Sequence, residues 1–392
     1  MNRGKFVFSQ VVEFIPRYQF DKLVKQYKGD WHAKNLNSYN HLLHLLFGQL
    51  TGCDSLRDIC LCLEAHSKIL YHLGFRNTVN HTSLSRANES RDYRIFEGLG
   101  MYLIGLVGPM YSKAKLSDIS IDNVIYALDS TTISTSIKLA AWALGKYSKG
   151  AVKMHTLLDL RGSIPANIHI TDGKWHDSNE LDNLTPEPFA FYVMDKAYVD
   201  FKALFRFHLS QAFRVSRPKE NMKFTTVGQM GIPDEKSGII EDSLIRVTGY
   251  KSRKLYPEDM RFVRVYDPEN DTIVDFISNN LEVSALEISN LYRHRWDIEV
   301  FFKWIKQNIV VKTLWGFSEN AVKIHLWTAI ISYLTIARIK ADKGSCYSIT
   351  EVATTIRISA LERVELRQLI TKQDSTINSN QNVKELSLFD DF

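Results

Sequence analysis

Two short apolar runs of the chain each end in an aspartate. Residues 124–128 lead into Asp129, and residues 189–194 lead into Asp195. Continuous apolar runs of this length are typical of strands that are buried on both faces of a parallel sheet. The carboxyl ends of neighbouring parallel strands line one crevice. The sequence therefore predicts an α/β sheet that brings two carboxylates together at one edge.

Carboxylates this close repel each other unless a cation lies between them, and Mg²⁺ and Mn²⁺ prefer carboxylate oxygens as ligands. The alternative is that Asp129 and Asp195 are ordinary strand-end or turn residues. Asp159 and Asp172 also end apolar runs, but a glycine-containing turn follows each and accounts for it. No glycine closely follows Asp129 or Asp195, which favours a role for them beyond turn formation.

A strongly apolar helix is predicted over residues 285–307, and it carries a polar stripe. At about 100° per residue, Tyr292, Arg295, Glu299 and Lys306 fall within an arc of about 60°. Because the rest of this helix is mostly apolar and core-like, the stripe must face a partner, a cleft or a metal ion. A salt bridge between Arg295 and Glu299 is the simpler alternative. It accounts for neither Lys306 nor the two aspartates.

At this point the chain resembles a known family. The pattern Tyr292-x2-Arg295-x3-Glu299-x6-Lys306 resembles the YREK signature of DDE transposases of the insertion sequence 4 family. The residues around Asp129 and around Asp195 resemble the segments that hold the family's first two catalytic aspartates. The gaps between the three acids are 66 and 104 residues. The long second gap matches the family's habit of carrying a β-rich insertion before the final glutamate.

The resemblance implies an RNase H-like catalytic core with two divalent ions, Mg²⁺ or Mn²⁺, held by Asp129, Asp195 and Glu299. It implies cut-and-paste transposition: binding of terminal inverted repeats, cleavage of double-stranded DNA, and transfer of the cut ends to target DNA by a dimer. Tyr292, Arg295 and Lys306 would contact phosphates. Trp296 would stack on an unpaired base, although a Trp in the core is the commoner case. A cytoplasmic, nucleoid-associated protein of a prokaryote is expected.

Two other functions stay open from the sequence. One is a transposase-derived DNA-binding protein that no longer cuts, and the other is an RNase H-like nuclease that hydrolyses DNA without joining strands. The presence of all three acids argues against the first. Strand-transfer products and a preference for one terminal repeat would argue against the second.

The predicted organisation has four parts. Residues 1–120 form a helical DNA-binding domain, residues 121–216 and 283–345 the core, residues 217–282 a β-rich insertion, and residues 346–392 a helix and tail. Helices are expected over 39–50, over 56–63 and after Thr82. Their tight turns are compatible with a helix-turn-helix or with a simple packing domain. The first 50 residues hold seven Lys or Arg against three acids.

Overall charge and composition set further bounds. The net charge of +5 permits nucleic acid as a partner without requiring it. Four cysteines are too few and too poorly spaced for a disulfide framework or a zinc ribbon. The most apolar stretch, 326–337, is shorter than the roughly 20 residues of a membrane span, so no membrane insertion is expected.

Two clusters of basic residues are predicted to make further DNA contacts. The alternative is that each cluster is only a solvated face of the protein. The first cluster is Lys202, Arg206, Arg214, Arg217, Lys219 and Lys223, and the second is Lys251, Arg253 and Lys254.

Overall fold

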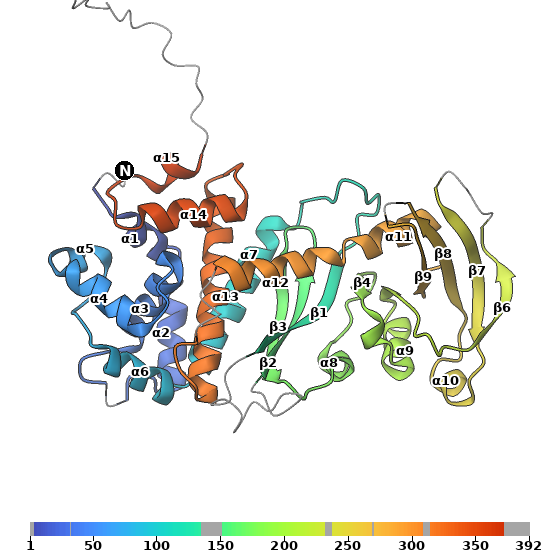
Figure 1. Cartoon of the computed structure of the whole chain (residues 1–392), viewed down its shortest axis with the longest axis horizontal. Coiled ribbons are helices and arrows are strands. Elements are labelled where there is room, and N and C mark those ends of the chain that lie inside the picture. Colours follow the sequence, from blue (N-terminus) through green and yellow to red (C-terminus); the bar gives the residue numbers. More distant parts are fainter. Residues whose placement is uncertain are drawn as a thin grey trace, which may run out of the picture.

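The computed structural model describes residues 4–31, 33–134, 151–231, 237–268, 270–308 and 314–371. A body of helices lies at one end of the molecule and a mixed α/β part at the other (Figure 1). The prediction of a helical N-terminal region is confirmed. Its helices are α1 (Val7–Val12), α2 (Arg17–Gln26), α3 (Ser38–Thr51), α4 (Leu56–Ala65), α5 (Leu70–Leu73), α6 (His81–Ser90) and α7 (Arg94–Tyr111).

Local capping explains where the predicted helices begin and end. The Asn37 side chain accepts a hydrogen bond from the Asn40 amide at 2.8 Å and starts α3. Ser55 accepts one from the Asp58 amide at 3.2 Å and starts α4. Gly52 follows α3 with a φ of 78°, a left-handed conformation that ends the helix at little steric cost.

The longest helix, α13 (Glu319–Asp342), runs through the helical body and packs against α7, α3 and α6. Its internal hydroxyls, on Thr328, Ser332 and Thr335, each donate to the carbonyl four residues earlier, so they are satisfied without water. By length and composition α13 is able to cross a membrane, and it is longer than the 326–337 stretch. However, 89% of its most apolar window is buried inside the protein, as expected of a core helix.

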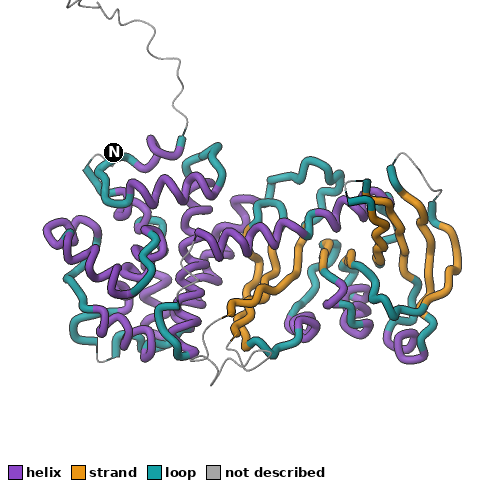
Figure 2. Tube along the Cα trace, in the orientation of Figure 1, coloured by secondary structure: helices purple, strands orange, loops and turns teal. Residues whose placement is uncertain are grey.

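The strands described by the structure form one nine-stranded sheet in the order β3-β2-β1-β4-β5-β9-β8-β7-β6. Its strands are drawn in orange in Figure 2. β1 is parallel to β4 and β4 to β5, whereas the other neighbours are antiparallel. The bounds are β1 (Ile125–Ser134), β2 (Ala151–Asp159), β3 (Ile164–Asp172), β4 (Phe191–Met194), β5 (Phe213–Ser216), β6 (Phe224–Gln229), β7 (Ile239–Val247), β8 (Met260–Asp267) and β9 (Thr272–Ser278). Short helices α8 (Asp177–Asn183) and α9 (Phe201–Leu209) flank β4 in the sequence.

Residues 217–282 contain β6 to β9 and α10 (Tyr250–Leu255). These strands do not make a separate sheet. They continue the main sheet through β5 and β9, where only Val215 with Ser278 and Ser216 with Ile277 are paired. The region is therefore rich in strands, as expected, but it extends the sheet from one edge. The four domain boundaries stay predictions.

The single helix predicted over 285–307 is wrong in one respect, because it is broken into α11 (Ala285–Arg293) and α12 (Trp296–Asn308). At the break, the Arg295 amide bonds the Tyr292 carbonyl three residues back, at 3.0 Å. The predicted helix near the C-terminus is likewise two shorter ones, α14 (Ile349–Ser359) and α15 (Leu366–Ile370). α12 packs against β1 and α11 against the strands from β4 onward, so the break lies over the centre of the sheet (Figure 1).

Candidate active site

Asp129 and Asp195 follow the last residue pair of the parallel β1–β4 ladder. That pair is Leu128 with Met194. The next residue on each strand is an aspartate, so the register places the two acids at the same edge position of adjacent strands. The core residues before them are buried, with Leu128 at 1% and Met194 at 0% exposure. The sheet thus arranges the two acids side by side, as their positions after apolar runs predict.

The prediction that Asp129 ends its strand is wrong. β1 continues to Ser134 and pairs with β2 from Tyr126 to Ser134, with Asp129 opposite Thr156. Asp129 therefore lies just beyond the end of the β1–β4 pairing, at a position where β1 is still paired with β2. The Ser130 amide donates to Asp129 Oδ1 at 2.7 Å and fixes one carboxylate oxygen.

Arg295 links the first and third acids. Its Nη2 lies 2.8 Å from Glu299 Oε1, and its Nη1 lies 3.4 Å from Asp129 Oδ2. The salt bridge considered as an alternative from the sequence is therefore present, and it reaches beyond the helix to β1. Arg295 Nε is buried and has no hydrogen-bond partner. One guanidinium thus contacts two carboxylates at the junction of α11 and α12 and offsets only part of their charge.

Tyr292 reaches the second acid. Its hydroxyl donates to Asp195 Oδ1 over 3.5 Å, at the limit of a hydrogen bond. The Tyr292 ring is half-buried against Phe276, with ring centroids 4.9 Å apart. Burial raises the pKa of Tyr292, so its hydroxyl keeps its proton and acts as a donor at neutral pH.

Burial raises the pKa of Asp129 to about 6, and the negative charges of Glu299 and Asp195 act in the same direction. The Ser130 amide and Arg295 oppose this rise only in part. The three acids therefore lie within electrostatic reach of one another, in a place where another negative charge is costly and a cation is favoured.

Other predicted contact residues lie along α12. Lys306 is two turns beyond Glu299, and partial burial lowers its pKa. Trp296, at the start of α12, is 60% exposed. The alternative of a core tryptophan is therefore wrong for Trp296, and its indole is available to a ligand.

One residue of the predicted basic clusters cannot contact DNA. Arg214 is fully buried in β5, with its guanidinium carbon 5.4 Å from the centre of the Tyr256 ring. Arg217, three residues later, is exposed. It lines a cavity of about 430 Å³ together with Tyr292 and Arg293. The cluster is thus divided between the core and the surface beside the acids.

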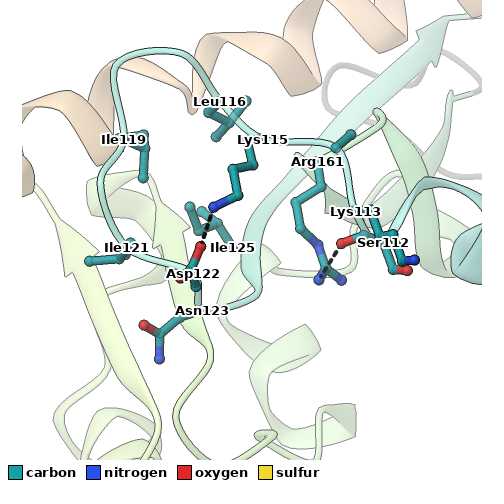
Figure 3. A pocket seen from close by; sticks show the side chains of 11 residues that line it. Ser112, Lys113, Lys115, Leu116, Ile119, Ile121, Asp122, Asn123, Ile125 and Arg161 are labelled. Carbon is teal, nitrogen blue, oxygen red and sulfur yellow. Dashed lines mark hydrogen bonds and ion pairs between the residues drawn. The ribbon is translucent and has the colours of Figure 1, made fainter.

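A second, much smaller cavity of about 80 Å³ lies beside Ile125, the first residue of β1 (Figure 3). Ile125, Lys113 and Arg161 are among its lining residues. Arg161 donates to the Ser112 carbonyl across it at 3.3 Å. None of the predicted site residues lines this cavity, so it is separate from the acids.

Within the described ranges, no three His, Cys, Asp or Glu side chains are arranged to hold a metal ion together. The donor chemistry nevertheless fits divalent ions, because Asp129, Asp195 and Glu299 offer only carboxylate oxygens. Arg295 offsets part of the charge of Asp129 and Glu299. Cation binding by these acids would therefore require the guanidinium to yield part of its contact.

Sequence reasoning missed a polar group next to Asp129. Ser130 Oγ donates to Asp177 Oδ1 at 2.7 Å, and Lys153 Nζ lies 3.0 Å from the same oxygen. Asp177 follows a loop and Lys153 lies inside β2, so neither stands out as a motif. Two histidines lie near this group: His155 is buried, and His169 pairs with Glu180 at 2.9 Å.

Comparison with known proteins identifies the family of the chain. A family model described as a transposase DDE domain matches residues 121–335, and one described as a domain of unknown function matches residues 3–76. A transposase of Sinorhizobium fredii is 33% identical over 53% of this chain and 58% of its own length. A Geobacillus stearothermophilus transposase for an insertion sequence element is 26% identical over 60% and 61%. A similar protein of Synechocystis is 28% identical over 66% and 71%.

The matched part of the chain thus spans about three fifths of the first two of these relatives. A piggyBac transposase synaptic complex with hairpin DNA gives a TM-score of 0.49 at 10% identity, over 96% of this chain and 87% of that one. That score is too low to establish a shared fold. The domain match covers more than half of the chain and includes all three acids, so the chain belongs to the transposase DDE domain family.

Proposed function

We propose that this chain is the DNA transposase of an insertion sequence. It binds the terminal inverted repeats of its element, cuts DNA at their boundary and joins the freed ends to target DNA. The observation that carries the proposal is the convergence of three acids from three elements: Asp129 in β1, Asp195 after β4 and Glu299 in α12. Arg295 and Tyr292 join them within one polar cluster.

The order of strands supports an RNase H-like core. β3, β2 and β1 form an antiparallel group, and β4 and β5 follow β1 in parallel. The acids lie at the carboxyl edge of the parallel strands, and the third acid comes from a helix across that edge. This is the arrangement that the resemblance in sequence implies.

Asp129, Asp195 and Glu299 would hold two Mg²⁺ or Mn²⁺ ions. When bound, such ions activate an attacking oxygen and neutralise charge on the leaving oxygen during phosphoryl transfer. The chain's own residues do the rest of the positioning. Arg295 suits a bidentate contact with a phosphate, whereas Lys306 offers a point charge and Tyr292 a hydroxyl donor.

Exposed Trp296 would stack on a base that is unpaired near the cut. The N-terminal helices would supply further DNA contacts, and cutting two ends together favours a dimer on DNA. The site of action would be the prokaryotic cytoplasm, where the nucleoid is accessible.

The test compares the wild-type protein with Glu299→Gln on a labelled duplex that carries the element's terminal repeat, with Mg²⁺ or Mn²⁺. The expected result is cleavage at the repeat boundary by the wild type, followed by strand transfer. Glu299→Gln should bind the same duplex with unchanged affinity and not cut it. Binding without cleavage by the wild type would identify an inactive derivative, and cleavage without strand transfer a nuclease.

A further inference from the structure

A partly buried ion pair lies next to Asp129, on residues that have no place in the proposed chemistry. Lys153 Nζ is 3.0 Å from Asp177 Oδ1 and also donates to the Trp175 carbonyl at 3.0 Å. The side chains are 17% and 28% exposed. The pair connects β2, which neighbours β1 in the sheet, with the start of α8.

The charge of the pair is well defined. Burial by itself would raise the pKa of Asp177, but hydrogen bonds from Ser130 and Lys153 hold it below its ordinary value. His155 Nδ1 lies 3.7 Å from the same carboxylate, and burial lowers the pKa of His155, so this ring is neutral. Lys153 is therefore the cation that holds Asp177.

Ser130 connects this pair to the first acid. Its hydroxyl donates to Asp177 Oδ1 at 2.7 Å, while its amide donates to Asp129 Oδ1 at 2.7 Å. Adjacent residues of a strand point to opposite faces. Rotation of β1 about its axis would break the Ser130–Asp177 bond and would turn the Asp129 carboxylate, still held by the Ser130 amide, away from its place in the site. Fixing the Ser130 hydroxyl on one face fixes the Asp129 carboxylate on the other.

Tyr198 lies beside the same residues. Its ring is buried, and after burial itself the charges of Asp129 and Asp177 contribute most to raising its pKa. Tyr198 follows Asp195 by three residues, so the neighbourhood of Asp177 includes the short helix that comes after the second acid.

We propose that Asp177 is a positioning residue for Asp129, held by Lys153 and acting through Ser130. The inference rests on the proposed function, since it concerns cation binding by the acids. Residues that orient a metal ligand commonly change metal affinity about 10- to 100-fold when removed. Removing one partner of a largely buried ion pair also lowers stability, so the Mn²⁺ affinity of the folded variant, measured well below its Tm, is the readout that a merely structural role would not change.

The experiment measures Mn²⁺ binding directly, from the loss of the free-ion signal in electron paramagnetic resonance, in Asp177→Ala, Ser130→Ala and the double variant. Asp177→Ala should weaken Mn²⁺ binding about 10-fold or more at a temperature where the variant is fully folded, with repeat-DNA affinity near that of the wild type. The double variant should resemble Asp177→Ala, because both changes remove the same bond. Lys153→Arg should retain most of the Mn²⁺ affinity.

Asp275→Ala is the matched control. Its side chain is 31% exposed and pairs with Arg264 at 2.8 Å in the part of the sheet away from the acids. It should leave Mn²⁺ binding unchanged. If Asp177→Ala lowers Tm more than Asp275→Ala but leaves Mn²⁺ affinity intact, Asp177 is merely structural and the inference is wrong. If the wild type binds no Mn²⁺, the proposed function itself fails.

Discussion

Arg295 and Glu299 form a 2.8 Å ion pair in which the arginine precedes α12 and the glutamate lies in its first turn. The same guanidinium also reaches Asp129 at 3.4 Å. One positive charge therefore pairs with two of three neighbouring carboxylates. The cluster of these four side chains keeps an excess of negative charge when all three acids are ionised. This imbalance leads to a prediction about stability.

Replacement of Asp129 by asparagine should stabilise the protein at neutral pH. The pKa of Asp129 is raised from 3.8 to about 6 in the folded chain. Between these values the folded state binds the proton more tightly than the unfolded state, so stability falls as pH rises through this window and stays lower above it. Asp129→Asn removes that loss. We expect a gain of about 1–3 kcal/mol at pH 7.5 and none below pH 3.8.

Chemical denaturation at pH 3.5 and 7.5 checks this, with Asp275→Asn as the control at an ordinary ion pair. Since Asp275 pairs with Arg264, that control should show no gain at pH 7.5. An Asp129→Asn variant that is less stable than the wild type at pH 7.5 would contradict the electrostatic account of the site.

The sequence predicts Asp129 and Asp195 correctly as neighbours because the apolar runs identify two buried strands, and parallel pairing of those runs places the residue after each run at the same position. It does not predict that β1 continues to Ser134. Residues 129–134 are mostly polar and have no strand pattern of their own, and their pairing with β2 is a tertiary contact. The local sequence pattern thus identifies the two acids, but it does not predict the strand pairing that holds the backbone around Asp129 in place.

The break between α11 and α12 was also missed because it depends on tertiary contacts. No Gly or Pro occurs between residues 285 and 308, so the sequence indicates one helix. In the structure His294 bonds both Asp118, at 2.6 Å, and Asp297, at 2.9 Å. The first contact joins residues 176 positions apart. Long-range pairing of this kind cannot be read from helical periodicity.

The same histidine predicts a pH effect. Hydrogen bonds to Asp297 and Asp118 raise the pKa of His294 from 6.5 to about 8. The contribution of His294 to stability is thus complete below pH 6.5 and disappears as pH rises through about 8. His294→Gln should lower Tm by about 1–3 °C at pH 6 and have almost no effect at pH 9. Calorimetry at both pH values tests this, and an equal loss at pH 9 would show that packing, rather than charge, matters at the break.

Arg214 and Arg217 should differ sharply in DNA binding. Arg214 is buried beside Tyr256 and Met260, whereas Arg217 is exposed near Tyr292. We expect Arg217→Ala to weaken binding of repeat DNA and to reduce the salt dependence of the binding constant by about one phosphate contact. Arg214→Met should leave both quantities unchanged, because the long apolar side chain fills the same space.

Fluorescence anisotropy across a salt series measures both variants of this pair. The sequence places Arg214 and Arg217 in one predicted DNA-contacting cluster. The structure predicts that only Arg217, which is exposed, affects DNA binding. A loss of salt dependence in Arg214→Met would mean that this guanidinium reaches DNA after all. An unchanged slope in Arg217→Ala would exclude the cavity beside Tyr292 from the DNA path.

Replacement of Trp296 should affect cleavage of repeat DNA far more than it affects the stability of the protein. Its indole is 60% exposed, so Trp296→Ala should change stability by no more than about 0.5 kcal/mol. Stacking on a base is worth about 1–3 kcal/mol, so cleavage of repeat DNA should fall about 5- to 150-fold. Trp327, fully buried in α13, is the control of opposite character, since Trp327→Ala should cost about 3–5 kcal/mol of stability. If Trp296→Ala cuts DNA at the wild-type rate, the exposed indole does not stack on a base, and the contacts near the cut come from Tyr292, Arg295 and Lys306 alone.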